Sequence, residues 1–150
     1  MKEISVSEST GILRKNYTGH LAYISDGKPY VVPITYYFDP EDNTLISYTT
    51  EGHKVNALRK NSSVSLVVEE IHSMVNWESA LVLGEFEELD GEKAKEKLHT
   101  FIEGIKGIIH RQEHKNVEFI NEFSSKSYSR GNPIIYIIKI LEITGRRRET

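Results

Sequence analysis

Gly27 to Asn61, with the sequence GKPYVVPITYYFDPEDNTLISYTTEGHKVNALRKN, is the segment around which the predicted fold of this chain is organised. It predicts a strand over Pro29–Phe38, a turn, a second strand over Leu45–Thr50 and a short helix that begins at His53. The first strand is apolar on both faces, which is typical of a strand buried between layers or inside a barrel. Pro33 cannot donate a ladder hydrogen bond, so we expect the strand pairing to be broken locally at that residue.

The end of the second predicted strand gathers groups that bind phosphate. Thr49 and Thr50 supply hydroxyls, Gly52 turns the chain, and His53 and Lys54 open the helix where its backbone N–H groups are free. Anions are stabilised at such helix starts by the free N–H groups and the helix dipole. The alternative is that the two threonines are ordinary strand residues and that the two cations are exposed side chains. The convergence favours a phosphate site.

The rest of the chain alternates predicted strands and helices. Strands are expected over Gly19–Ser25, Ser63–Glu69, Trp77–Leu89 and Pro133–Thr144, and helices over Val6–Lys15, Gly91–Ile109 and Gln112–Ser125. Gly84 predicts a bulge or a close approach within its strand, while Gly104 and Gly107 weaken the last turns of their helix. Six antiparallel strands with a few flanking helices indicate one mainly β (α+β) domain over residues 1–150, built as a small antiparallel barrel.

Composition limits the function. The chain has 150 residues, a formal net charge of -3 and no cysteine. Its charge gives no electrostatic reason to expect nucleic-acid binding. The absence of cysteine excludes disulfides, thiolate catalysis and cysteine-ligated metals, and fits a reducing compartment. The N-terminus lacks the apolar region of a signal peptide, and the apolar run Ile134–Ile138 is too short to cross a bilayer, so we expect a cytoplasmic protein without membrane contact.

The histidines do not predict a metal site. His110 and His114 have helical i, i+4 spacing, but no third ligand stands near them in the sequence, and solvated surface histidines are the simpler interpretation. No Walker, Rossmann or nucleophile-elbow pattern occurs either.

Five segments taken together resemble the FMN-binding split barrels of the pyridoxamine 5'-phosphate oxidase-like family, in the branch of the nitroimidazole-reductase-like flavoproteins. The segments are PYVVPITYYFD (29–39), ISYTTEGHK (46–54), NALRKNSSVSLVV (56–68), WESALVLGEFEEL (77–89) and IIYIIKILEITGR (134–146). Their order is more specific than any one of them. The resemblance implies a six-stranded antiparallel split barrel with a few flanking helices, and FMN as the cofactor.

The resemblance also implies a set of cofactor-binding residues and a homodimer with the flavin at its interface. The cofactor-binding residues are Val32, Pro33, Ile34, Thr35, Tyr48, Thr49, Thr50, Gly52, His53, Lys54, Trp77 and Ser79. The last two would reach the flavin across the subunit boundary. No catalytic residue is assigned, because the flavin supplies the redox chemistry. Apolar residues on both faces of Pro29–Phe38 and Pro133–Ile143 independently predict a C2 homodimer.

Two functions follow from the resemblance. The first is an FMN-dependent oxidoreductase that acts on a small organic acceptor such as a nitro compound or a quinone. The alternative is a non-enzymatic flavin- or haem-binding barrel used for storage, sensing or regulation. Synthesis of pyridoxal phosphate is not expected, because basic and histidine-containing motifs used by those oxidases would follow Gly145, where this chain has Arg146–Arg148.

Overall fold

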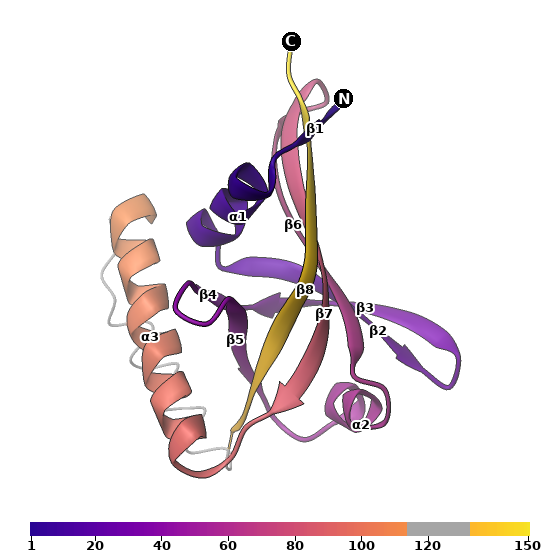
Figure 1. Cartoon of the computed structure of the whole chain (residues 1–150), viewed down its shortest axis with the longest axis vertical. Helices are drawn as coiled ribbons and strands as arrows, with labels where there is room; N and C mark the ends of the chain where they lie inside the picture. The colour runs from indigo at the N-terminus through magenta and orange to yellow at the C-terminus, as the bar shows by residue number, and fades with distance from the viewer. Residues whose placement is uncertain (114–132) are drawn as a thin grey trace.

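The computed structural model describes residues 1–113 and 133–150, which form a curved antiparallel sheet with helices packed around it (Figure 1). The elements are β1 Lys2–Ile4, α1 Val6–Lys15, β2 Thr18–Ser25, β3 Lys28–Thr35, β4 Tyr37–Asp39, β5 Thr44–Thr49, α2 His53–Lys60, β6 Ser63–Ser73, β7 Asn76–Glu88, α3 Gly91–Glu113 and β8 Ile134–Arg148. The strand order is β3-β2-β6-β7-β8-β5-β4, and β1 pairs with β8. No ladder within the described residues joins the two ends of this order. The predicted mainly β, antiparallel split barrel is therefore confirmed.

The expected strands and helices are present wherever the structure describes them, with one short additional strand, β1. Helix α1 has its predicted bounds because Ser5 and Glu8 form a reciprocal cap at its start. The helix expected over Gln112–Ser125 lies outside the described residues except for its first two, which belong to α3.

The prediction of one continuous strand over Pro29–Phe38 is wrong. The segment is divided at Tyr36 into β3 and β4. The Tyr36 backbone N–H donates to the Tyr17 carbonyl oxygen at 2.8 Å, and its buried hydroxyl donates to the Leu13 carbonyl oxygen at 2.9 Å. These two bonds hold Tyr36 against the segment around α1, so the chain changes direction there.

Two expectations about β3 are also wrong. Its pairing with β2 is continuous from Thr35 to Lys28 and passes through Pro33 without a shift. Since β3 is an edge strand of the sheet, half of its N–H groups have no ladder partner, and a proline is tolerated there. The strand is not buried on both faces in the single chain either, because the side chain of Val31 is largely exposed.

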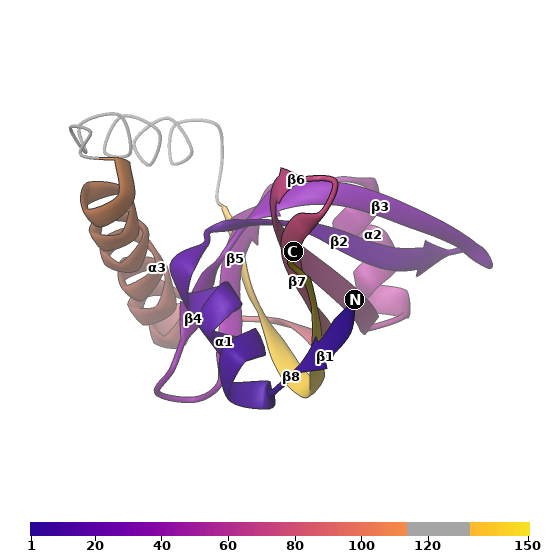
Figure 2. The ribbon, with the colours of Figure 1, turned by 90° about the horizontal axis from the view of Figure 1, so that it is seen from above.

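Two apolar clusters form the core. The first fills the inside of the curved sheet and includes Leu21, Tyr36, Leu66 and Tyr136, all of which are fully buried. The second lies between α3 and the strands β5 and β8. Figure 2 shows α3 outside β4 and β5, on the opposite side of the molecule from α2 and the β2–β3 hairpin.

Two glycines permit close packing. A Cβ atom at Gly104 would lie 2.3 Å from the Tyr37 ring, so glycine lets α3 approach β4. The helix continues to Glu113, beyond the two glycines that were expected to weaken its last turns. A Cβ atom at Gly84 would lie 2.5 Å from the Lys139 carbonyl oxygen, and the register between β7 and β8 shifts beside it. The predicted irregularity at Gly84 is confirmed.

Candidate functional site

The open side of the barrel brings together two segments that the sequence assigned to one site. At one end, the Ser47 hydroxyl of β5 donates to the Thr35 carbonyl oxygen of β3 at 2.6 Å. At the other end, the Tyr30 ring of β3 meets the His53 ring of α2 edge to face, with centroids 4.9 Å apart. No ladder within the described residues joins β3 to β5, so residues 31–34 and residues 48–52 lie between these two contacts without strand pairing to each other. We call this stretch without pairing the seam.

The β3 side of the seam presents its residues alternately. Ile34 is buried in the barrel core and Val32 packs against it, whereas Pro33 and Thr35 are exposed on the other face. Because β3 is an edge strand, its backbone groups on the seam side have no strand partner within residues 1–113 and 133–150, and those not bonded to Ser47 can bond a polar ligand edge. Of the four residues predicted to line the flavin ring, two therefore offer apolar side chains toward the barrel interior.

Lys54 is a half-buried cation at the seam. Its side chain is half-buried, and its ammonium nitrogen lies 5.8 Å from the centroid of the Tyr136 ring. Burial lowers the pKa of Lys54, and within the described residues no carboxylate forms an ion pair with it. A desolvated cation without a counter-ion is the kind of group that an anionic ligand stabilises.

Tyr136 lies beneath Lys54 and carries a second unsatisfied group. It is fully buried, and its hydroxyl has no hydrogen-bond partner in the part of the chain described. Burial raises the pKa of Tyr136 to about 12, against the opposing influence of Ser47, its pair across β5 and β8. The Ser47 proton is donated to Thr35, and the geometry between the Ser47 and Tyr136 hydroxyls is not that of a hydrogen bond.

His53 is held by two tyrosines, and we call Tyr23, Tyr30 and His53 the aromatic cluster. The Tyr23 hydroxyl lies 3.1 Å from the His53 Nδ1 atom, and which of the two donates depends on the histidine tautomer. The Tyr23 and Tyr30 rings are stacked with centroids 5.4 Å apart. The cluster fixes one ring nitrogen of His53 and leaves Nε2 as the nitrogen that a ligand can reach.

The remaining phosphate-site residues surround the start of α2. Gly52 precedes the helix, and no side chain of the described residues caps the first-turn N–H groups. Thr49 is half-buried and Thr50 is exposed, and the Thr49 hydroxyl makes a long contact of 3.4 Å to the Thr50 carbonyl oxygen. Uncapped N–H groups and weakly engaged hydroxyls together can accept an anion.

Glu51, at the same turn, is neutralised by an arginine that the sequence did not single out. Both Glu51 oxygens accept hydrogen bonds from Arg59, at 2.8 and 3.0 Å, and Arg59 also donates to Glu88 at 2.7 Å. Arg59 lowers the pKa of the Glu51 carboxyl. This pairing keeps the negative charge of Glu51 compensated where an anion would bind.

Sequence reasoning missed the aromatic cluster, although a signal existed. The two-residue turn at Asp26 and Gly27 pairs Ser25 with Lys28. Counting outward along the hairpin places Tyr23 opposite Tyr30, as observed. No comparable signal in the sequence brings His53 to them.

Trp77 and Ser79 do not reach the seam of the same chain. Trp77 lies opposite Ile71 and Arg148, near the far end of the β6–β7 hairpin. In both directions along the sheet, other strands separate β7 from the seam. Their predicted contact with a flavin across a subunit boundary stays a prediction.

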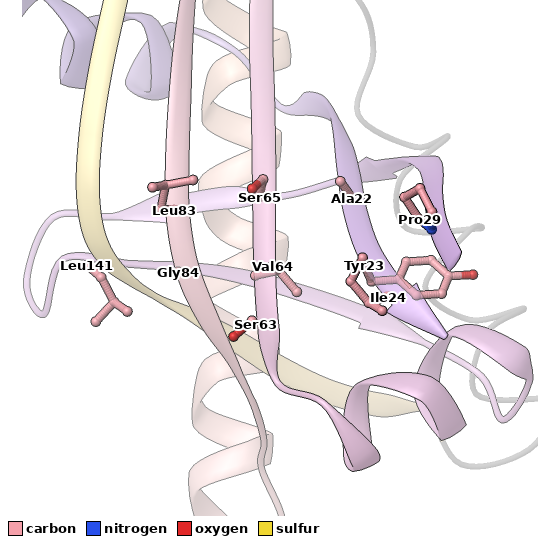
Figure 3. A pocket seen from close by; sticks show the side chains of 10 residues that line it. All are labelled: Ala22, Tyr23, Ile24, Pro29, Ser63, Val64, Ser65, Leu83, Gly84 and Leu141. Carbon is pink, nitrogen blue, oxygen red and sulfur yellow. The ribbon is translucent and has the colours of Figure 1, made fainter. Parts of the chain in front are cut away.

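Two hollows lie outside the seam. One is a groove of about 370 Å³ on the outer face of the sheet, where Ile24, Ser65, Leu83 and Leu141 converge (Figure 3). The other, of about 310 Å³, lies between the β2–β3 turn and α2. Within residues 1–113 and 133–150, no three histidine or acidic side chains gather as a metal site, and no helix is long and apolar enough to cross a membrane.

Comparison with known sequences identifies one family. The sequence model described as pyridoxamine 5'-phosphate oxidase matches residues 5–147. An uncharacterised protein of Rhizobium meliloti is 31% identical over 103 residues, which cover 67% of each chain.

Solved structures share the whole fold. A FAD-binding protein from Mesorhizobium loti superposes with a TM-score of 0.76 at 26% identity, over 99% of this chain and 97% of its own. The FAD and haem binding protein of Mycobacterium smegmatis gives 0.73 at 16% identity, over 100% of this chain and 75% of its own. A candidate 5-nitroimidazole antibiotic resistance protein of Bacteroides thetaiotaomicron gives 0.68 at 18% identity, over 96% of this chain and 85% of its own.

Proposed function

The chain belongs to the pyridoxamine 5'-phosphate oxidase family, as its ordered segments predicted, and we propose that it is a flavin-dependent oxidoreductase acting on a small organic acceptor. A nitro compound or a quinone is the acceptor class we favour. The proposal places the flavin in the seam, held by the portion that FMN and FAD have in common. When bound, the flavin supplies the transfer of electrons or hydride.

Lys54 carries the proposal. It is a half-buried ammonium group without a carboxylate partner among the described residues, beside the uncapped start of α2. A flavin phosphate at this point would pair with Lys54, accept from the first-turn N–H groups and reach the hydroxyls of Thr49 and Thr50. The residues present therefore fit the phosphate end of a flavin nucleotide.

The β3 edge fits the flavin ring. Backbone groups along residues 32–35 that have no ladder partner can bond the polar edge of the ring, apart from the Thr35 carbonyl oxygen that accepts from Ser47. The inward side chains of Val32 and Ile34 exclude water from one side of the ring. No described side chain in the seam is required as an acid or a base. The role of the protein in this proposal is binding, orientation and exclusion of water.

A C2 homodimer is the second part of the proposal. The outer face of the sheet exposes the apolar side chains of Ile24, Val31, Leu81, Leu83 and Leu141. Register places Val31 beside Ala22, Ala22 beside Ser65 and Ser65 beside Leu83, so these strands present a continuous surface. Exposed apolar surfaces of this kind mark interfaces. Light scattering on micromolar protein is expected to give twice the mass of the 17.2 kDa chain, and a flavin-loaded monomer would contradict it.

The alternative is a non-enzymatic barrel that holds flavin or haem. The fold similarity to a FAD and haem binding protein supports this candidate. Function depends on the site and not on the fold, so a measurement of catalytic turnover distinguishes the two candidates. We expect small molecules as ligands in both cases, with no nucleic acid or membrane partner, and the cysteine-free sequence fits a cytoplasmic location.

The test is spectroscopic. Purified protein is expected to be yellow and to release a flavin on denaturation. Under anaerobic conditions, NADH or NADPH is expected to bleach the bound flavin, and a nitro compound or a quinone to restore its absorbance. Protein that binds no flavin at micromolar concentration overturns the proposal. A bound flavin that neither nicotinamide reduces supports the non-enzymatic alternative.

A further inference from the structure

Three lysines of the described chain are half-buried, and they differ in their counter-ions. Lys97 is paired with two aspartates at 2.9 Å, and the Lys106 ammonium nitrogen lies 3.6 Å from a Glu103 oxygen. Lys54 has no ion pair with any described residue. The other lysines that the structure describes are exposed. Lys54 is therefore distinguished among the described lysines, because it is partly removed from water and has no carboxylate partner.

The carboxylate nearest to Lys54 in the sequence is bound elsewhere. Both oxygens of Glu51 accept hydrogen bonds from Arg59, at 2.8 and 3.0 Å. Lys54 instead meets the Tyr136 ring, whose centroid lies 5.8 Å from the ammonium nitrogen. An aromatic ring attracts an ammonium group but, unlike a carboxylate, forms no charge-assisted hydrogen bond with it. No ion pair within the described chain therefore holds the Lys54 amine in its protonated form.

These surroundings make the Lys54 amine a nucleophile. A lysine reacts as a nucleophile only after it has lost its proton, and a solvated lysine is almost fully protonated at neutral pH because its usual pKa is about 10.4. Burial lowers the pKa of Lys54 and so increases its unprotonated fraction. The side chain is only half-buried, which leaves the amine within reach of a small reagent. Lys54 is therefore the described lysine best placed to be acylated.

The neighbours of Lys54 select the class of acylating reagent. The first-turn N–H groups of α2 have no side-chain cap among the described residues, and the hydroxyls of Thr49 and Thr50 lie just before that turn. These groups favour a phosphate. An acyl phosphate carries a phosphate on its reacting carbonyl, so its binding at this point would bring the acyl carbon close to Lys54.

We propose that Lys54 is an acylation site for small acyl phosphates such as acetyl phosphate, and that its acylation controls flavin binding. The Lys54 nitrogen attacks the acyl carbon and forms an amide bond, while the bond from that carbon to the phosphate oxygen breaks. Inorganic phosphate leaves with the electron pair and takes up the proton that the amine loses. The amide is uncharged and cannot pair with a flavin phosphate. The control of flavin binding rests on the proposed function, because it requires the flavin phosphate to bind Lys54.

The experiment measures the acetylation of flavin-free protein by acetyl phosphate. The rate at each lysine is followed by mass spectrometry of proteolytic peptides. Lys60 is the matched control, because it lies at the opposite end of the same helix and its side chain is exposed. Lys54 is expected to react roughly tenfold faster than Lys60. Equal rates at the two lysines overturn the proposal.

A second reagent tests the role of the phosphate. Acetic anhydride acetylates amines but carries no phosphate, so its preference for Lys54 over Lys60 is expected to be smaller than that of acetyl phosphate. Excess inorganic phosphate is expected to slow the reaction of acetyl phosphate at Lys54 and to leave the reaction at Lys60 unchanged. The same preference with both reagents overturns the assignment to acyl phosphates.

Flavin titrations test the control of binding. Saturating FMN is expected to slow acetylation at Lys54 and not at Lys60. Acetylated wild type is expected to bind FMN roughly tenfold more weakly than unmodified protein, and to bind riboflavin equally well. Lys54→Gln, which resembles the acetylated side chain, should show the same loss, whereas Lys60→Gln should not. Unfolding temperatures check that both variants are folded.

Lys54→Arg is the control for acetylation at other lysines. It keeps a positive charge and cannot be acetylated, so treatment with acetyl phosphate should not change its FMN affinity. Selective acetylation of Lys54 that leaves FMN binding unchanged overturns the control of flavin binding. If unmodified protein binds no flavin, the proposed function fails, while the acetylation rates of Lys54 and Lys60 still decide whether Lys54 is an acylation site.

Discussion

Two partly buried lysines, Lys97 on α3 and Lys54 on α2, are held in opposite ways. Lys97 donates to Asp39 and to Asp42, each at 2.9 Å, and its side chain is only 12% exposed. Burial alone would lower the pKa of Lys97, but the bonds to the two aspartates outweigh it and raise the pKa. Lys54 faces an aromatic ring, and burial lowers its pKa, with no compensating carboxylate among the residues that the structure describes.

The difference separates a structural cation from a binding cation. Lys97, Asp39 and Asp42, which we call the Lys97 cluster, join α3 to the β4–β5 turn, and the two carboxylates compensate the lysine charge within the chain. The half-buried charge of Lys54 is uncompensated in the described chain. Such a charge lowers the stability of the ligand-free protein, and a bound anion would remove this penalty. Variants of each lysine test this distinction.

The largest effect is expected from Lys97→Ala on stability. The substitution leaves the Asp39 carboxylate, which is 4% exposed, without its cation. An uncompensated buried carboxylate should lower the free energy of unfolding by about 3 kcal/mol, measured by urea denaturation. Lys95→Ala, on the exposed side of the same helix, should cost less than about 0.5 kcal/mol. Similar costs for the two variants would show that the Lys97 cluster is not structural.

Lys54→Ala should behave in the opposite way, with a loss of ligand affinity and little loss of stability. A charge-assisted bond to phosphate is worth about 1.5–3 kcal/mol, so FMN affinity should fall roughly tenfold to hundredfold. Riboflavin lacks the phosphate, and it should bind wild type and variant alike in a fluorescence titration. If both ligands weaken equally, Lys54 has a structural role and the phosphate lies elsewhere.

Two buried tyrosines extend the comparison to neutral groups. Tyr36 donates to the Leu13 carbonyl oxygen at 2.9 Å, whereas the Tyr136 hydroxyl has no partner in the described chain. Tyr36→Phe should therefore cost about 1–1.5 kcal/mol of unfolding free energy, and Tyr136→Phe should cost nothing or stabilise the ligand-free protein. Thermal unfolding of the two variants shows which substitution destabilises the protein more. An equal loss of stability would show that the Tyr136 hydroxyl does have a hydrogen-bond partner.

The smallest effect is a difference in alkaline pH dependence. The raised pKa of Lys97 means that its contribution to stability is complete below the usual lysine value of about 10.4, and is lost as pH rises through its folded-state pKa. The lowered pKa of Lys54 has the opposite sign, so stability rises between its folded-state pKa and about 10.4. Urea unfolding of ligand-free protein between about pH 8 and about pH 11 should show the rise vanish in Lys54→Ala and persist in Lys97→Ala. A rise that Lys54→Ala retains would show that another group causes it.

The family, the fold class and the elements that depend on nearby residues could be predicted from the amino-acid sequence alone. The capping pair of Ser5 and Glu8 set the start of α1, and the Asp26–Gly27 turn set the β2–β3 register. Gly84 marked the irregularity beside β8. These features could be predicted because each depends on a few neighbouring residues or on the alternation of one strand.

Contacts between residues far apart in the sequence set which lysine has carboxylate partners and where the long predicted strand breaks. Lys97 meets Asp39 across 58 positions of sequence, and Tyr36 is held by Leu13 across 23. Lys54 and Tyr136 meet because sheet order places β8 beside β5. The carboxylates near a lysine in the sequence do not predict which carboxylates contact that lysine in the folded protein. The charge that remains for a ligand is therefore set by strand order and register, which no local pattern encodes.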